Sequence, residues 1–252
     1  MSNPELEILR ADLNIPGVHV GTTTRLGGSS HAPYHSLNLA THVGDEESAV
    51  AANRARLEQT LVLPSQPCWL QQVHGKQVYR IKTSSQGLTA DGSYTDTPGV
   101  VLAVLTADCL PVVLASEKGD EVAVVHAGWR GLAAGVIESA LQLFSCEQTA
   151  IQAWLGPAIG MQNYEVDRQV YDAFMSIDTQ HQPAFASSRS GHWHANLYTL
   201  ACQRLQHMGV RQIRGGGQTA TWCSYEQDEL FFSYRRDGDT GRMATLAWLE
   251  PE

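Results

Sequence analysis

The 252-residue sequence predicts a mixed α/β fold, in which a mixed β-sheet is flanked by helices. Short apolar runs bounded by polar or glycine-containing turns are typical of strands buried on both faces. Longer stretches that place apolar residues at helical spacing are interspersed with these runs. No repeat, linker or low-complexity segment divides the sequence, so we expect residues 1–252 to form a single domain.

The apolar runs predict strands along most of the chain. Their interruption by glycine, proline, serine and aspartate marks where each strand ends. The predicted strands cover residues 18–24, 68–75, 78–81, 100–105, 111–115, 122–125, 151–155, 210–213, 229–234 and 242–249.

Helical spacing predicts four helices, over residues 46–61, 132–144, 166–175 and 194–208. Asp45 is placed to cap the first of them. The buried candidates of that helix are Ala49, Val50, Ala52, Ala55 and Leu57. Residues 83–98 are rich in Thr, Ser, Gly and Asp and predict a long loop around Ala90-Asp91-Gly92, and loops of this length are often functional.

The stretch from Gly99 to Phe144 predicts where a site lies. If the strands at 111–115 and 122–125 pair as a hairpin about Lys118-Gly119, Pro111 faces His126. Cys109 then ends close to His126, at the end of the hairpin where the following helix begins. The sequence therefore predicts that a thiol and an imidazole meet at this end of the sheet.

Composition limits the class of protein. The net charge is −9 and no basic run offsets it, which argues against binding to duplex nucleic acid. No window approaches 18 uninterrupted apolar residues, so we expect no membrane partner. Residues 1–17 lack the basic and apolar regions of a signal peptide, and the five scattered cysteines form no disulfide framework. We therefore expect a cytoplasmic protein with reduced thiols.

Two of the ten histidines differ from the rest in their surroundings. His74 and His126 each follow a predicted strand and precede a glycine by one or two residues, which exposes the ring at a sheet end. Together with Cys109 they offer a thiolate and two imidazoles, the ligand set of a catalytic zinc site with one open position. A Cys-His nucleophile pair needs the same two groups in contact, and the sequence does not separate the two readings.

Polar residues near this trio in the sequence are further candidates for catalytic or phosphate-binding roles. Asp108 adjoins Cys109 and is a candidate orienting group or general base. Arg130 lies at the predicted start of a helix, where a guanidinium suits phosphate in a bidentate fashion. Arg25 and Arg235 are the next candidates for the same role.

Six motifs in the same order resemble a known family. The motifs are Ser36-Leu37-Asn38-Leu39, Gln72-Val73-His74-Gly75, Thr106-Ala107-Asp108-Cys109, His126-Ala127-Gly128-Trp129-Arg130-Gly131, Gly156-Pro157-Ala158-Ile159-Gly160 and Phe231-Phe232-Ser233-Tyr234-Arg235-Arg236-Asp237. This pattern resembles the bacterial YfiH family, which is called the polyphenol oxidase or laccase-domain family and is also described as purine nucleoside phosphorylases. The resemblance extends from about Arg25 to Leu249.

The resemblance implies both a fold and an activity. The fold is a mixed-sheet, cysteine-hydrolase-like α/β domain, and zinc is bound by His74, Cys109 and His126. The implied reaction is phosphorolysis of adenosine, inosine and S-methyl-5′-thioadenosine, with adenosine deamination as a second activity. We expect Cys109, His126 and Asp108 to be catalytic and Arg130, Arg25 and Gln72 to bind substrate or phosphate. The expected partners are a purine nucleoside and phosphate.

Other functions remain open at this stage. Copper-dependent phenol oxidation and editing of cell-wall precursors by a Cys-His hydrolase have also been proposed for the family. A copper site of this ligand type adds a weak axial ligand, and no methionine lies in the ligand motifs. A multicopper enzyme needs several paired histidines, whereas His192-Trp193-His194 is the only such pair in the sequence. A non-enzymatic metal-binding module is the remaining alternative, and the oligomeric state is not predicted.

Overall fold

Two β-sheets that pack face to face form the centre of the computed structural model, which describes residues 5–216 and 222–251. The larger sheet is mixed, with strand order β14-β10-β8-β9-β6-β4. Its strands are β4 (Val78–Arg80), β6 (Gly92–Thr95), β8 (Leu110–Ser116), β9 (Val122–Ala127), β10 (Ile151–Leu155) and β14 (Gln212–Gly215). The smaller sheet is antiparallel, with order β1-β2-β15-β7. Its strands are β1 (Ile8–Arg10), β2 (Val18–Thr23), β7 (Leu102–Thr106) and β15 (Met243–Leu249).

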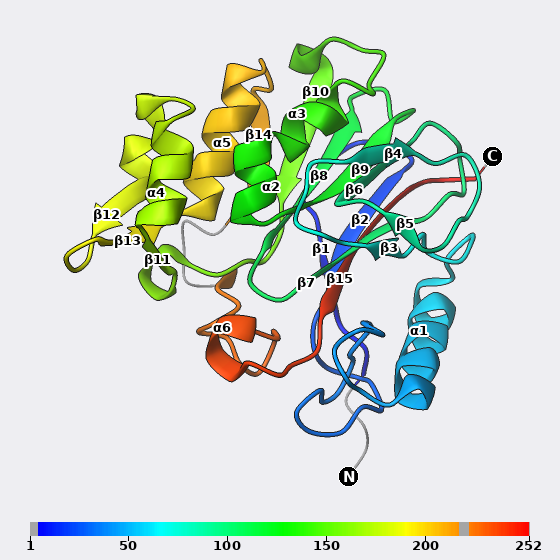
Figure 1. The fold of residues 1–252 in the computed structure, drawn as a ribbon. Helices are drawn as coiled ribbons and strands as arrows, with labels where there is room; N and C mark the ends of the chain where they lie inside the picture. The colour runs from blue at the N-terminus through cyan, green and yellow to red at the C-terminus, as the bar shows by residue number, and fades with distance from the viewer. Residues whose placement is uncertain (1–4, 217–221, 252) are drawn as a thin grey trace.

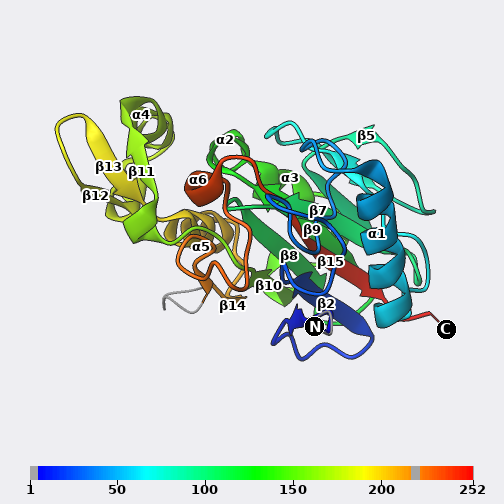
Figure 2. The same cartoon turned by 90° about the horizontal axis from the view of Figure 1, so that it is seen from below.

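Helices cover the outer faces of both sheets, which gives a four-layered molecule (Figures 1 and 2). Helix α1 (Glu47–Leu61) packs on the antiparallel sheet. The mixed sheet is covered by α2 (Trp129–Ala134), α3 (Val136–Leu141) and α5 (Leu197–His207). No helix in the described part of the chain is both long and apolar enough to span a membrane.

Smaller elements extend the molecule at both ends. Helix α4 (Arg168–Met175) and a three-stranded sheet lie at the end opposite α1 (Figures 1 and 2). The strands of that sheet are β11 (Glu165–Asp167), β12 (Phe185–Ser187) and β13 (His192–Ala195). The other short elements are β3 (Leu70–Gln71), β5 (Leu88–Thr89), α6 (Tyr234–Asp237) and the 3₁₀ helices η1 (Gln148–Ala150), η2 (Met161–Asn163) and η3 (Thr179–Ala184).

Strand β7 shows why the apolar runs are continuous. Leu102 and Val104 point into the core between the two sheets, whereas Ala103 and Leu105 pack on the side of α1. Since side chains alternate between the faces of a strand, burial of both faces requires an unbroken apolar run. The predicted mixed α/β class is confirmed, and the second sheet is an addition to it.

The predicted hairpin register is confirmed. Strands β8 and β9 are antiparallel, and Pro111 lies opposite His126. The register of a second strand pair matters equally for the site. In the pair of β15 and β7, Met243 lies opposite Thr106. The ends of the two sheets therefore bring residues 107–109 beside both the end of β9 and the start of β15.

Several predicted boundaries are wrong, each for a local reason. The predicted helix 132–144 is divided at Gly135, whose φ of +94° ends α2 before α3 begins. The predicted loop 83–98 contains β5 and β6. Residues 229–234 form no strand; Phe231 and Phe232 are buried against Ala107 and Met243. The third and fourth helices begin later than predicted, capped by Asp167 and Asn196. Residues 1–4, which belong to the segment predicted to lack a signal peptide, lie outside the described residues.

Helix α1 buries a polar residue on its inner face. Its buried side chains are Val50, Asn53 and Leu57, while the predicted candidates Ala52 and Ala55 are exposed. Asp45 does not cap the helix: its carboxylate accepts hydrogen bonds from the Glu46 amide and the Asn38 side chain. The spacing of alanines was therefore a poor guide to the buried face.

Asn53 fixes the loop that precedes α1. Its amide group donates to the Ser30 hydroxyl at 2.9 Å and to the carbonyls of Ser36 and Asn38 at 3.2 and 2.8 Å. Its carbonyl oxygen accepts from the Ser29 amide at 2.8 Å. One buried side chain thus bonds several backbone groups of residues 29–38 and ties this loop to the helix.

We predict that Asn53→Ala lowers the free energy of unfolding by about 2–3 kcal/mol, because it leaves buried donors and acceptors unpaired. Urea denaturation followed by circular dichroism measures this change. Gln59→Ala, on the exposed side of the same helix, is the control and should change stability by less than about 0.5 kcal/mol. Equal effects of the two substitutions would contradict the role given to Asn53.

Candidate metal centre

Three side chains that could hold a metal ion converge at the ends of the two sheets. The ligand atoms of His74, Cys109 and His126 all lie within 4.8 Å of one another. His74 belongs to the loop after β3, Cys109 precedes β8 directly, and His126 lies in β9. The Cys109 Sγ and His74 Nε2 atoms are 4.0 Å apart, and the two imidazole rings meet edge to face. The structure therefore brings together the trio predicted from the sequence.

A buried carboxylate orients this trio. Asp91 is fully buried and its Oδ1 lies 2.8 Å from His126 Nδ1. The same carboxylate accepts hydrogen bonds from the amides of Val73, His74 and Gly75 at 3.2, 2.9 and 2.6 Å. Because Nδ1 of His126 is engaged by Asp91, its Nε2 is left to bind a metal, as in carboxylate–histidine–zinc arrangements.

Backbone conformation reinforces the geometry. His74 and Asp108 have positive φ angles, +59° and +91°, that non-glycine residues rarely adopt. Such conformations cost about 1–3 kcal/mol each and cluster at functional sites. Gly128 completes the fit, since a Cβ atom there would lie 3.0 Å from Cys109 Sγ and 3.1 Å from His74 Cδ2. Only a residue without a side chain leaves this space to the ligands.

The charges of the trio are coupled. Burial alone would raise the pKa of Cys109, but the charge of His126 and hydrogen bonds with both histidines outweigh it and lower this pKa to about 6. Burial alone would lower the pKa of His126, but the Cys109 thiolate and Asp91 raise it to about 9. The pKa of Asp91 is lowered despite its burial, because His126 and the Gly75 amide donate to it. A metal ion needs the thiolate form that this environment favours.

The donor set fits a catalytic metal site. Zinc binds thiolate at about 2.3 Å and imidazole at about 2.0–2.1 Å, so tetrahedral ligand atoms lie about 3.5 Å from one another. The three ligand atoms, which lie within 4.8 Å of one another, are close to this spacing. Three protein ligands leave the fourth position to water or substrate. Within the ranges 5–216 and 222–251, no other group of three such side chains converges.

The trio lies in the wall of a cavity of about 480 Å³, a size typical of sites for small molecules. The other residues that line it are His42, Gln72, Leu105, Thr106, Ala107, Asp108, Ile159, Tyr164, Tyr234, Arg235 and Arg242. Metal ligands, two tyrosines and two arginines therefore face the same space.

Asp108 lies in this wall, but its carboxylate is already engaged. Oδ1 accepts from the Ser224 hydroxyl and Oδ2 from the Arg235 amide, both at 2.6 Å. The Asp108 carbonyl also accepts from the Ile159 amide. The carboxylate therefore fixes the segment that carries Arg235, and the general-base role stays a prediction.

The three residues predicted to bind substrate or phosphate differ in position. Gln72 lines the cavity, but its amide pairs with the backbone N–H and C=O of Leu105. The Arg25 guanidinium donates to the carbonyls of His35 and Asp228 and does not line the cavity. Arg130 is exposed, lies over the Trp129 ring and is also outside the lining.

Several residues of the site are not predicted from the sequence. Asp91 falls within the predicted long loop, and its place as a lone aspartate between small residues before a strand is the signal that identifies it. No sequence motif indicated three further residues of the cavity, Arg242, His42 and Tyr164. Tyr234 lies inside the last motif but was not assigned a role.

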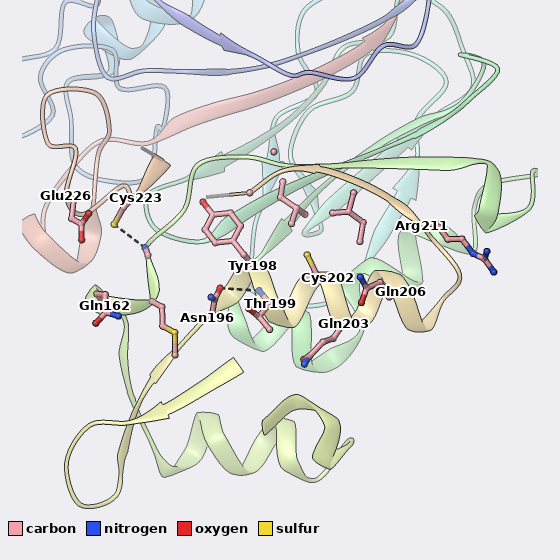
Figure 3. A pocket seen from close by; sticks show the side chains of 16 residues that line it. Gln162, Asn196, Tyr198, Thr199, Cys202, Gln203, Gln206, Arg211, Cys223 and Glu226 are labelled. Atoms are coloured by element: carbon pink, nitrogen blue, oxygen red, sulfur yellow. Dashed lines mark hydrogen bonds between the residues drawn. The ribbon is translucent and has the colours of Figure 1, made fainter. Parts of the chain in front are cut away.

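A larger cavity, of about 810 Å³, contains none of the trio (Figure 3). It lies beside α5, with Tyr198 and Cys202 on one side and Cys223 on another. Cys223 Sγ accepts from the Gly160 amide at 3.1 Å, while the next residue, Ser224, reaches Asp108. The smaller cavity is the candidate site because it holds the metal ligands.

We predict that Asp91→Asn weakens Zn²⁺ binding by about 10–100-fold, because an amide removes the charge that orients His126. Competition against a chromophoric chelator measures this affinity. The control is Asp96→Asn, since Asp96 pairs with Arg80 at an exposed position and should leave metal binding unchanged. Circular dichroism checks that both variants fold; unchanged affinity in folded Asp91→Asn would refute the orienting role.

Comparison with known proteins identifies the family to which the chain belongs. Among curated relatives, a Shigella flexneri protein named purine nucleoside phosphorylase YfiH is 49% identical over 234 residues, which cover 92% of this chain and 94% of the relative. A Haemophilus influenzae protein named purine nucleoside phosphorylase is 44% identical, with 97% and 100% covered.

Solved structures support the same relationship. A crystal structure of a Neisseria meningitidis protein superposes with a TM-score of 0.90 at 42% identity and covers 97% of this chain and 99% of its own. A Bacillus licheniformis hypothetical protein YfiH gives a TM-score of 0.86 at 32% identity, with 92% and 93% covered. Residues 19–250 match the family described as multi-copper polyphenol oxidoreductase laccase. The chain therefore belongs to this family, whose YfiH-named members the sequence motifs indicated.

Proposed function

We propose that this protein is a zinc-dependent purine nucleoside phosphorylase acting on adenosine, inosine and S-methyl-5′-thioadenosine. The observation that carries the proposal is the convergence of His74, Cys109 and His126 in a cavity of nucleoside size. The names of relatives that align over nearly the whole chain supply the reaction class.

The reaction requires an anion and a nucleoside in one cavity. A phosphate oxygen forms a bond to C1′ of the ribose while the bond from C1′ to the purine nitrogen breaks. The products are the sugar 1-phosphate and the free base, which takes up the proton that phosphate gives up. A site for this reaction must therefore bind phosphate and stabilise negative charge on the departing base.

The residues of the cavity divide these tasks. Tyr164 and Tyr234 offer aromatic faces for the purine, and the arginines offer donors to the anion. When bound by the trio, zinc supplies Lewis-acid polarisation and positions a reactant. Cys109, as a ligand, is then not available as a nucleophile. Deamination of adenosine, which replaces the amino group by a water oxygen and releases ammonia, is proposed as a second activity in the same cavity.

A specific observation favours a second candidate, a Cys-His hydrolase. The Cys109 and His126 charges are coupled and Asp91 bonds the far side of His126, which resembles a nucleophile, base and orienting acid. His74 argues against it, because a nucleophile pair does not need a second imidazole beside the thiol.

Copper-dependent phenol oxidation, suggested by the family description, is less favoured. A multicopper enzyme needs several ligand clusters, and the described residues contain one. The lining of the candidate cavity, as described, includes no methionine that would provide a weak axial ligand.

We predict that chelation abolishes activity and that Zn²⁺ restores it, because the proposed reaction needs the metal. Cys109→Ser should lose metal affinity together with turnover. Iodoacetamide should alkylate Cys109 faster in the metal-free protein than in the loaded protein, since coordination shields the thiolate. Cys146→Ser, at a cysteine outside the cavity, is the matched control and should keep both properties.

The hydrolase and zinc readings separate cleanly in this experiment. If verifiably metal-free protein keeps full activity while alkylation of Cys109 abolishes it, the zinc mechanism is wrong. Incubation with a nucleoside panel, with and without phosphate, then tests the reaction: release of base must depend on phosphate, whereas release of ammonia must not.

A further inference from the structure

Two arginines in the cavity lack carboxylate partners. Arg235 and Arg242 both line the space that contains the metal ligands. Neither forms an ion pair with any residue of the described ranges, 5–216 and 222–251. The charges of Cys109 and Asp108 act on Arg242, although neither group forms an ion pair with it. In a chain of net charge −9, two guanidiniums without an ion pair beside one cavity favour binding of an anion there.

Each guanidinium keeps donors for a ligand. Nη1 of Arg242 donates to the carbonyls of Thr240 and Gly241 at 2.7 and 2.9 Å. Nη1 of Arg235 donates to the Glu165 carbonyl at 2.9 Å. The Nε and Nη2 groups of both arginines bond to nothing else among the residues that the structure describes. These two groups form the edge of the guanidinium that binds an oxyanion in bidentate fashion.

Both arginines are held in place from the backbone. The Arg235 amide donates to the Asp108 carboxylate, and the Arg242 amide donates to Asn38 Oδ1 at 3.0 Å. Asn38 is fully buried, and Asn53 bonds its carbonyl. The bond from the Arg242 amide to Asn38 gives a role to the Ser36–Leu39 motif, which supplies none of the three metal ligands.

Aromatic rings support the two side chains. The Arg235 guanidinium lies 5.2 Å from the centre of the Tyr164 ring, and that of Arg242 lies 5.7 Å from the centre of the Tyr234 ring. A cation–π contact of this kind favours one side-chain position and so limits the rotations that binding must restrict. Burial lowers the pKa of Arg242, the charges of Cys109 and Asp108 oppose this effect, and a bound anion would oppose it further.

Strand register explains why Arg242 reaches the trio. Met243 lies opposite Thr106 in the β15–β7 pair, so the residue before Met243 lies beside residues 107–108. Arg130 is exposed, as Arg235 is, but unlike Arg235 and Arg242 it does not line the cavity.

We propose that Arg235 and Arg242 form an oxyanion subsite beside the His-Cys-His trio and that this subsite takes inorganic phosphate. The choice of phosphate rests on the proposed phosphorolysis, whereas the subsite itself rests on the geometry of the two guanidiniums. A phosphate group on a nucleotide offers the same chemistry, so the test must distinguish it from free phosphate.

The test is calorimetric titration of the zinc-loaded protein with inorganic phosphate and, separately, with adenosine 5′-monophosphate. Arg242→Lys keeps the positive charge but removes the paired Nε and Nη2 donors, and we expect it to weaken phosphate binding by about 10-fold. Arg235→Lys should act similarly, and Arg242→Gln should weaken binding further. The phosphate KM should rise in parallel, while the nucleoside KM changes by less than about 2-fold.

Arg168→Lys is the matched control, because Arg168 also lies over an aromatic ring, that of Trp193, but outside the cavity. It should bind phosphate as the parent does. Unchanged phosphate affinity in folded Arg242→Lys and Arg235→Lys would overturn the proposal, as would a 10-fold loss in Arg130→Lys alone. Tighter binding of the nucleotide than of phosphate, lost in the same variants, would overturn the choice of free phosphate.

The outcomes also separate this proposal from the proposed function. Phosphate binding that depends on the two arginines, without release of base from any nucleoside, supports the subsite and refutes phosphorolysis. Phosphate-dependent release of base that survives both substitutions supports phosphorolysis and refutes the subsite.

Discussion

The buried carboxylate of Asp91 is the interaction on which the site depends. An ionised group without water is stable only if donors replace its hydration, and here three consecutive amides and one imidazole do so. Those donors come from the loop after β3 and from β9, while Asp91 itself directly precedes β6. The requirement for charge compensation therefore joins three separate parts of the chain and sets the positions of two metal ligands at once.

The same logic recurs elsewhere in the lining of the cavity. Asp108 and Asn38 use buried oxygens to hold the amides of Arg235 and Arg242. In both walls a buried polar side chain binds backbone, and the backbone in turn presents a functional side chain. This arrangement positions the functional side chains while it leaves part of their hydrogen-bonding capacity, Nε2 of His126 and the Nε and Nη2 groups of the arginines, available for a ligand.

The local pattern of the sequence is sufficient to predict part of this structure. The continuous apolar runs identified β7, β8 and β9, and the turn at Lys118-Gly119 gave the register that joins Cys109 to His126. Asp91 and Arg242 could not be found in this way, because their places depend on pairings between distant strands, Gly92 with Val125 and Met243 with Thr106. The prediction of a strand at Phe231-Phe232 is wrong because these residues are buried by a loop. In sequence, a pair of buried apolar loop residues cannot be told from a short strand.

The pairing of β2 with β15 has a consequence for how the chain is made. Strand β2 pairs with β15, and the paired residues Thr22 and Thr245 are 223 positions apart, so an early strand finds its partner only after a long stretch of chain has been synthesised. Until then its hydrogen-bonding edge is open, and open edges attract other chains. Because the closing contacts are so distant in sequence, the final step of folding is expected to be slow compared with formation of the β8–β9 hairpin. While the intervening residues are synthesised the sheet stays unfinished, so this fold exposes an open strand edge for longer than a helical bundle whose contacts are local in sequence.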